Sequence, residues 1–415
     1  MVWLACWPAT AQLVLLPRDT TYQVVASHYR YQQGERTRPA RSGLHRLITY
    51  DTVSLDTLSF SSSACISLLT CGPGDEFYST FGHTALRVYD SLRGIDLVYN
   101  YGTFDFDQPH FYLRFAQGRL LYALSCSSYE AFVHSYAQEG RWVVEQRLNV
   151  DSSALSDMVH TLSHTLQTDS LRHYHYDFFM DNCATRVRDI MCQAIPLQDS
   201  TSCHTTFRSL LSSYMADSLE WWQLGIDMVL GARCDREATG GERMFLPREL
   251  MERTAVVDSG QFVSSTHQLL KHCRQPLVPS WHPWLIAWLL YLFVLAASIA
   301  EVWAGWRMGW MDVLLFLLVG LASLIIIFLW LFSDHYCTKA NWNILWCNPL
   351  ALYFAFARRR SKRWLLIAQG LAMAVVVVGF NWLLPQHFNP AVLPIVLLLM
   401  LRLFCFRFTT PRRRT

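Results

Sequence analysis

Two short segments of the sequence carry side chains suited to nucleophilic catalysis. Cys183 comes directly after Asp181 and Asn182, at the predicted start of a helix. The free N–H groups at a helix N-terminus favour an anion, so they lower the pKa of a thiol and make the thiolate available. His83 begins a predicted strand directly after Gly82. Because an imidazole beside a cysteine completes an activated pair, the sequence predicts Cys183 as nucleophile and His83 as base.

Asn100 lies near the end of the next predicted strand, where an amide can hold the imidazole of His83 in one tautomer. Each of these residues also has a simpler interpretation. Cys183 can be a small buried residue, His83 a structural histidine, Asn100 a strand-end turn residue and Asn182 a helix N-cap. Composition and spacing leave both interpretations open.

The elements that would position these side chains form an α+β domain. Apolar runs bounded by turn residues predict strands at 63–70, 83–90, 96–101, 120–126 and 141–150, the second and third forming a hairpin. Helical spacing predicts helices at 155–166, 183–194 and 205–214, the first of them capped by Ser152 and Ser153.

The sequence changes character at Trp281, where long charge-free apolar runs begin. A helix needs about 20 apolar residues to cross a bilayer. Three runs are long enough and two are shorter, so we predict an all-α transmembrane bundle of about five helices: Trp281–Ala300, Val313–Phe332, Ile344–Ala357, Trp364–Leu384 and Ala391–Phe406. Arg402 lies near one end of the last run, where its side chain can extend towards the interface.

Basic residues set the expected orientation. They gather at 358–363 and in the tail after Arg407, whereas the loops at 333–343 and 385–390 hold one basic residue between them. The positive-inside rule then places the tail in the cytoplasm and the N-terminal domain outside it. In a Gram-negative cell this predicts a multi-pass protein of the inner membrane with its N-terminal domain in the periplasm. The net charge of +3 is too small to indicate a nucleic-acid partner.

We therefore divide the chain into five parts. Residues 1–11 resemble the remnant of a signal peptide, because Ala9, Thr10 and Ala11 fit a cleavage site. Residues 12–60 form a poorly defined segment with weak periodicity, 61–279 the periplasmic domain, 280–407 the transmembrane domain and 408–415 a basic cytoplasmic tail.

Other polar residues are candidates for metal or ligand sites. The 12 cysteines include no CxxC pair, so no zinc site or other metal is expected, although Cys192 and Cys203 could pair in an oxidising compartment. Asp227, Asp235 and Glu242 fit no metal spacing and are interpreted as solvated loop charges. Polar residues at membrane depth are often functional, so a cluster at the outer ends of the spans is a candidate lipid or substrate contact, with an asparagine-capped turn as the alternative: His335, Asn341, Asn343 and Asn348.

Several longer segments carry a resemblance. The order of a His on one strand, a polar residue on the next and a Cys at a later helix start resembles the permuted papain-like fold of NlpC/P60-like and lecithin:retinol acyltransferase-like enzymes. More closely, the chain resembles the Lnb-like lipoprotein N-acyltransferases of Bacteroides-type bacteria from about residue 63 to 400. The resemblance is carried by Leu68–Asp75, Tyr78–His83, Tyr99–Phe106, Asp181–Arg186, Leu224–Asp227 and Met244–Pro247, and by Ser333–His335, Asn341–Asn343 and Asn348–Leu350 in the membrane part.

This resemblance implies an acyl transfer without a cofactor. A phospholipid would donate an acyl chain to Cys183, and the α-amine of a lipoprotein's lipidated N-terminal cysteine would accept it. Asn182, Arg186 and Tyr176 would support the reaction, with backbone N–H groups at the helix start stabilising the oxyanion. A wall-degrading NlpC/P60-like cysteine peptidase or amidase is the main alternative, and a non-catalytic membrane scaffold is a third hypothesis.

Overall fold

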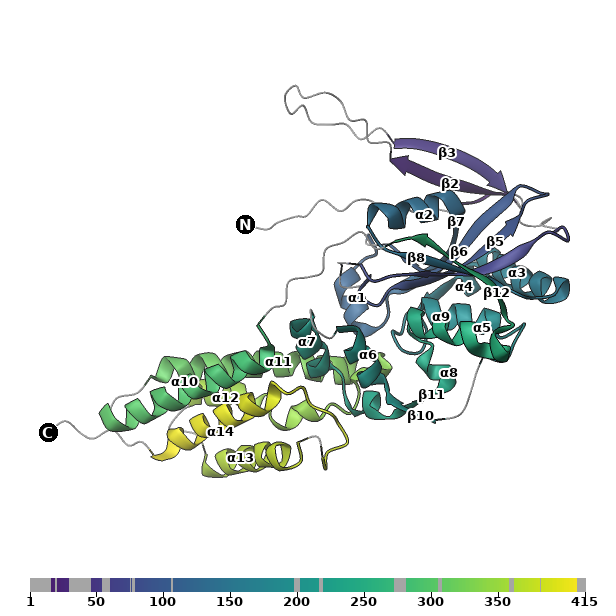
Figure 1. The fold of residues 1–415 in the computed structure, drawn as a ribbon. Helices are drawn as coiled ribbons and strands as arrows, with labels where there is room; N and C mark the ends of the chain where they lie inside the picture. The colour runs from purple at the N-terminus through teal and green to yellow at the C-terminus, as the bar shows by residue number, and fades with distance from the viewer. Residues whose placement is uncertain are drawn as a thin grey trace, which may run out of the picture. The chain divides into compact units, whose positions relative to one another are not determined.

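The computed structural model describes most of the chain in two compact units (Figure 1). The described residues are 16–18, 21–29, 46–53, 60–74, 76, 79–105, 107–197, 202–215, 219–271, 281–304, 308–357, 362–380 and 382–408. Unit 1 comprises Met1–Phe111, Leu120–Thr201 and Thr239–Gln275, and unit 2 comprises Tyr112–Arg119, Ser202–Ala238 and Pro276–Thr415. Two segments that precede the membrane helices in sequence therefore pack with them.

Unit 1 is built on a seven-stranded antiparallel sheet in the order β12-β8-β4-β5-β6-β7-β9. The strands are β4 (Cys65–Cys71), β5 (His83–Asp90), β6 (Ile95–Phe104), β7 (Leu121–Ser128), β8 (Val143–Leu148), β9 (His173–His175) and β12 (Val263–Leu270). All five predicted strands are present, and the predicted hairpin is β5–β6.

Helices cover both faces of this sheet (Figure 1). In β5, Leu86 and Val88 join a core that also contains residues of α3 (Ser152–Gln167), α5 (Cys183–Met191) and α9 (Pro247–Val256). Ala85 points to the opposite face, where it packs with Phe132 and Tyr136 of α2 (Tyr129–Gln138). The alternation of side chains along each strand thus produces a three-layer domain.

Smaller elements complete the two units. They are α4 (Asp169–Arg172), α6 (Phe207–Met215), α7 (Glu220–Val229), α8 (Gly240–Arg243), α1 (Phe111–Gln117), the strand pair β10 (Ser202–Thr206) and β11 (Glu237–Thr239), and the 3₁₀ turns η3 (Ala232–Asp235), η4 (Val257–Gly260), η5 (Tyr336–Thr338) and η6 (Trp342–Leu345).

Five apolar helices of unit 2 fall at the five predicted spans: α10 (Pro283–Ala304), α11 (Gly309–Phe332), α12 (Leu350–Ala357), α13 (Arg363–Val378) and α14 (Val392–Phe408). Among the described helices, α10 and α11 are long and apolar enough to cross a membrane by themselves. α13 and α14 are shorter, and α12 has only 8 residues. Polar loops separate them, and their apolar side chains share one core.

Four details differ from the sequence-based expectations. The N-cap of α3 is Asp151, whose carboxylate accepts from Ala154 N, so Ser152 and Ser153 lie inside the helix. α2 was not predicted. Part of segment 12–60 forms a three-stranded sheet, because its Thr, Val and Tyr residues favour strands: β1 (Leu16–Arg18), β2 (Thr21–Tyr29) and β3 (Arg46–Val53). Cys192 is a free thiol, so the suggested Cys192–Cys203 disulfide is wrong. The proposed cleavage site, Arg358 to Arg360 and the basic tail lie outside the described residues.

Candidate active site at the start of helix α5

Cys183 is the first residue of α5, and its position is fixed by Asn182. The Asn182 side-chain oxygen accepts from Ala184 N at 2.8 Å and Thr185 N at 2.9 Å, while Thr185 Oγ1 accepts from Asn182 N at 2.8 Å. This reciprocal pattern is a capping box, which satisfies N–H groups that the helix itself cannot. The sequence-based interpretation of Asn182 as an N-cap is therefore confirmed.

The remaining donors of Asn182 are also committed. Its amide nitrogen donates to Phe178 O at 2.7 Å and to Phe245 O at 2.8 Å, and the residue is only 3% exposed. Asn182 thus ties the α5 start to two separate backbone segments. Since its side chain has these four partners, its contribution to Cys183 is positional.

The sheet register brings His83 to Asn100. The pairs of β5 and β6 run from Asp90–Ile95 to Leu86–Tyr99, and the same register continued places His83 opposite Gly102 and diagonal to Asn100. The two side chains meet, with 2.5 Å between His83 Nε2 and Asn100 Oδ1. Because an amide oxygen only accepts hydrogen bonds, Nε2 carries a proton and Nδ1 is left to face another partner.

His83 also forms a hydrogen bond with the Cys183 side chain, so the contact predicted from the sequence is present. Burial alone would raise the pKa of the Cys183 thiol, but the charge of His83 and a hydrogen bond from it outweigh burial and lower the pKa. Backbone N–H groups of Thr84 and Ala184 also stabilise the thiolate. Burial conversely favours neutral His83, yet the charge of Cys183 and hydrogen bonds with Cys183 and Asn100 raise the pKa of the imidazole. The two side chains thus shift each other's pKa towards the charged forms, thiolate and imidazolium, which is the direction that activates a cysteine nucleophile.

Gly102 lies beside Cys183 and His83 and has no side chain to contact them. The residue has φ of +98° and lies where the β6–β7 register shifts, between Tyr101 and Thr103. A Cβ there would lie 3.5 Å from His83 Cε1 and 3.7 Å from the Cys183 Cβ. The bulge thus needs glycine for its backbone conformation, and the absent side chain leaves room above both reactive residues.

The two other supporting candidates, Arg186 and Tyr176, contact residues around the site. Arg186 forms an ion pair with Asp181, at 2.5 Å between Nε and Oδ1, and its guanidinium lies 4.2 Å from the ring centroid of Tyr174. Tyr176 stacks on Tyr122 with ring centroids 4.4 Å apart. Burial, followed by the charge of Cys183, holds the Tyr176 pKa well above its usual value, so this phenol stays protonated as a potential donor.

The aromatic residues beside the two catalytic segments pack mainly with one another. Phe81, Phe178, Phe179 and Phe245 form edge-to-face or tilted pairs with centroids 4.9 to 5.8 Å apart. Tyr101 and Phe104 make equivalent contacts with Tyr174 and Phe111, and Phe106 lies outside the described residues.

Sequence reasoning missed three contributors to the site. Thr84 supplies a backbone N–H, which no side-chain pattern reveals. Tyr136 stacks on His83, with ring centroids 6.5 Å apart, and Arg141 lies over the Tyr136 ring at 4.6 Å. The spacing of Phe132 and Tyr136 is typical of a helix face and would have placed the tyrosine against the sheet.

Comparison with known families gives two matches along the chain. Residues 52–213 match the Lnb N-terminal periplasmic domain, and residues 275–414 match the Lnb transmembrane domain. The chain belongs to the Lnb family. As an Lnb-family member it is a membrane protein with a periplasmic domain. No curated protein and no solved structure matches the chain.

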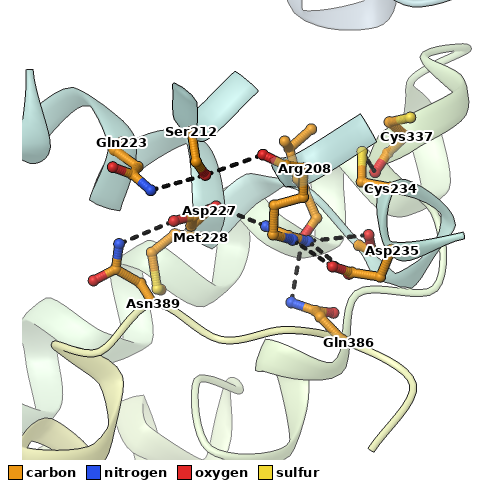
Figure 2. Close-up of polar contacts among 12 residues, drawn as sticks. Arg208, Ser212, Gln223, Asp227, Met228, Cys234, Asp235, Cys337, Gln386 and Asn389 are labelled. Atoms are coloured by element: carbon orange, nitrogen blue, oxygen red, sulfur yellow. Dashed lines mark hydrogen bonds and ion pairs between the residues drawn. The ribbon is translucent and has the colours of Figure 1, made fainter. Parts of the chain in front are cut away.

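The Lnb chain holds a second polar cluster, which lies in unit 2 (Figure 2). Arg208 donates to Asp227 Oδ1 and Asp235 Oδ1, each at 2.8 Å, and to the carbonyl oxygens of Leu230 and Gly231 at 3.2 Å. The Arg208 and Asp227 side chains are only 5% and 7% exposed. The interpretation of Asp227 and Asp235 as solvated loop charges is therefore wrong, because both carboxylates are largely buried and form ion pairs with Arg208.

Glu242 also departs from the solvated-charge interpretation, since its carboxylate accepts from Thr239 N at 3.0 Å in the capping box of α8. Within the described part of the chain, no three His, Cys, Asp or Glu side chains gather in a way that would hold a metal.

The membrane-loop asparagines are bonded within unit 2, and two of them, Asn341 and Asn343, contact the backbone of α7 beside the Arg208 cluster. Asn341 donates to Met228 O at 2.8 Å and accepts from Asn343 N at 3.0 Å, and the two asparagines are 0% and 1% exposed. Asn348 donates to Gln369 Oε1 at 2.8 Å. These contacts agree with the alternative of an asparagine-capped turn. His335 is the candidate that remains accessible, and its Nε2 contacts Phe115 O at 2.9 Å.

Arg402 forms a third buried polar cluster, among the membrane helices. It is 2% exposed and pairs with Glu301 of α10 at 2.8 Å and Asp312 of α11 at 2.5 Å. The expectation that this side chain extends to the interface is wrong, because two carboxylates on neighbouring helices provide partners inside the bundle.

Proposed function

We propose that this Lnb-family protein is a lipoprotein N-acyltransferase with Cys183 as nucleophile and His83 as base. The observation that carries the proposal is the Cys183–His83–Asn100 arrangement, with a lowered thiol pKa, in a periplasmic domain joined to a transmembrane domain. The order of strand His, strand Asn and helix-start Cys also supports a permuted papain-like core. We place the protein in the inner membrane as a multi-pass protein.

In the first half-reaction, the Cys183 thiolate attacks an ester carbonyl of a phospholipid. The tetrahedral oxyanion is stabilised by the backbone N–H of Cys183 at the α5 start, since Ala184 N and Thr185 N already donate to Asn182. The C–O bond to glycerol then breaks, and imidazolium His83 gives its proton to the leaving alkoxide. The products are a lysophospholipid and a thioester on Cys183.

In the second half-reaction, the α-amine of a lipidated lipoprotein cysteine attacks the thioester. An α-amine has a pKa of about 8, so a usable neutral fraction exists at neutral pH. His83 takes the amine proton as the C–N bond forms, the C–S bond breaks, and the Cys183 thiolate is restored beside the imidazolium. Asn100 keeps the imidazole oriented through both steps.

Transfer to the amine requires that water be kept from the thioester. Moving an acyl chain from apolar surroundings into water has an unfavourable free energy of about 0.8 kcal/mol for each CH₂. We therefore propose that an apolar path connects Cys183 to the bilayer, and that the aromatic residues beside the catalytic segments, among them Phe81 and Phe178, contribute to it. Both substrates are membrane lipids or lipid-anchored, so anchoring the enzyme raises their effective concentration.

Mass spectrometry of a lipoprotein's N-terminal peptide tests this proposal. Cells that express Cys183→Ala should lack the N-linked acyl chain, whereas Cys192→Ala should retain it, because Cys192 is a free thiol at the other end of α5. An unchanged acyl count with Cys183→Ala would refute the transferase.

The same cells separate the alternatives. Altered muropeptides with an unchanged acyl count would favour the NlpC/P60-like peptidase. A Cys183 thiol that does not react with iodoacetamide would favour a non-catalytic scaffold.

A further inference from the structure

Helix α1 of unit 2 exposes large apolar side chains. It buries none of its residues, and Tyr112, Leu113 and Phe115 are 84%, 49% and 41% exposed. A contiguous exposed apolar group on a short helix is uncommon on a surface that faces only water. Arg114 lies in its last turn. Aromatic and basic side chains on one short helix are typical of a segment that lies in a lipid interface.

The C-terminal end of α1 is fixed to the loop that follows membrane helix α11. Phe115 O contacts His335 Nε2 at 2.9 Å, and Gln117 O accepts from Asp334 N at 2.8 Å. Arg119 forms an ion pair with Asp334 at 2.6 Å. α11 ends at Phe332, so α1 is attached within a few residues of the end of this span.

Helix α7 is attached in the same way to the start of α10. Trp221 Nε1 donates to Trp281 O at 2.9 Å, and Glu220 pairs with His282 at 2.6 Å. Trp221 and Trp222 are 47% and 56% exposed.

The start of α10 and the end of α11 lie on the same side of the bundle if each helix crosses once, because only residues 305–308 separate them. The periplasmic domain leads into α10, so this is the periplasmic side. Trp281, two residues before α10, and Trp284 in its first turn are 69% and 45% exposed and continue the aromatic surface to this helix.

We propose that α1 and the first turn of α7 form an interfacial anchor that inserts into the outer leaflet of the membrane. The occupant is a phospholipid surface: the exposed rings of Tyr112, Phe115, Trp221 and Trp222 occupy the boundary between headgroups and acyl chains, where tyrosine and tryptophan are enriched. Arg114 lies at the headgroup phosphates. The anchor extends the lipid-facing surface of α10, and the inference depends on the membrane location and not on acyl transfer.

Photolabelling of the full chain in phospholipid nanodiscs tests the anchor. The nanodiscs contain a phospholipid with a diazirine near the ester end of its acyl chain, and mass spectrometry measures the labelled peptides. Peptides 111–117 and 220–223 should be labelled at least tenfold more than the peptide with Leu92, which is 74% exposed in the β5–β6 turn. The Trp281 peptide is the positive reference.

Tyr112→Glu should lower the labelling of peptide 111–117 at least fivefold. Labelling of the Trp281 peptide should stay unchanged, and this result would also show that the membrane helices are still folded. Leu92→Glu is the matched control and should change neither. Labelling of either helix at the level of Leu92, or crosslinks to a second protein chain in place of lipid, overturns the anchor for that helix. Cys183→Ala should label as the wild type does, so loss of acyl transfer and loss of the anchor are distinguishable.

Discussion

Replacing Asn182 by Asp separates helix capping from the other contacts of this residue. Aspartate keeps an oxygen for Ala184 N and Thr185 N and is itself a favoured N-cap, so capping alone predicts no loss of stability. Aspartate cannot donate, however, and Phe178 O and Phe245 O would lose their bonds of 2.7 and 2.8 Å at a residue that is 3% exposed.

Each buried polar group left without a partner costs about 1–3 kcal/mol. Two such losses, less a small gain from a carboxylate at the helix N-terminus, give about 3 kcal/mol. Since about 1.4 kcal/mol corresponds to a factor of ten, opening of the α5 start should become roughly 100-fold more frequent. The added negative charge should also raise the pKa of Cys183 and slow its alkylation near neutral pH.

Native-state hydrogen exchange of the full chain in nanodiscs measures this opening at the amides of α5. Asp151→Asn in α3 is the matched control, because Asp151 accepts from Ala154 N at 2.7 Å at an exposed cap and needs no donor. Hydrogen exchange at the amides of α3 should change by less than about threefold in Asp151→Asn, since asparagine and aspartate cap helices about equally well. If Asn182→Asp leaves α5 exchange unchanged, the tie between α5 and the two carbonyl groups is refuted.

Three further outcomes are expected. The rate of Cys183 alkylation by iodoacetamide should rise with pH, with a midpoint below the ordinary thiol pKa. His83→Gln should shift this midpoint to higher pH, because it removes the charge that stabilises the thiolate. The same midpoint in both proteins would contradict the interaction of Cys183 with His83. Gly102→Ala should cost about 1–3 kcal/mol, because φ is +98°, and should lower transferase activity at least tenfold; wild-type activity would exclude a role for the bulge. Arg208→Met should destabilise unit 2 by about 3–5 kcal/mol, measured by thermal unfolding in nanodiscs, because it leaves buried carboxylates without their partner. The control Arg248→Met removes an exposed ion pair and should cost less than about 1 kcal/mol. Equal effects of the two substitutions would contradict the buried cluster.

The sequence was sufficient to predict the central strands and the start of α5. Alternating or continuous apolar runs, bounded by glycine and polar turns, identify β4 to β8 because burial in a sheet selects such patterns. Asn182 before Cys183 predicted the helix start for a local reason, since the capping side chain bonds N–H groups only two and three residues away. The contact of His83 with Asn100 also followed from the β5–β6 hairpin, a local pairing.

The rest depends on partners that no local pattern identifies. Asp227 lies 19 residues from Arg208, and Asn389 lies 162 residues from Asp227, so the buried cluster in Figure 2 has no periodicity that would indicate it. Arg402 finds Glu301 101 residues earlier for the same reason. Charged residues are usually exposed unless paired, so the sequence-based expectation was solvation, and only the tertiary packing reverses it.

The interleaving of the two units constrains how such a protein can arise. The boundaries after Phe111, Arg119, Thr201, Ala238 and Gln275 take the chain from one unit to the other five times. A gene fusion that joined a finished hydrolase to a finished membrane anchor would leave one crossing. Ser202–Ala238 is synthesised before the membrane helices with which it packs, so unit 2 is complete only when the C-terminal part of the chain has been made. A cut at any single point of the chain would therefore divide at least one of the two units.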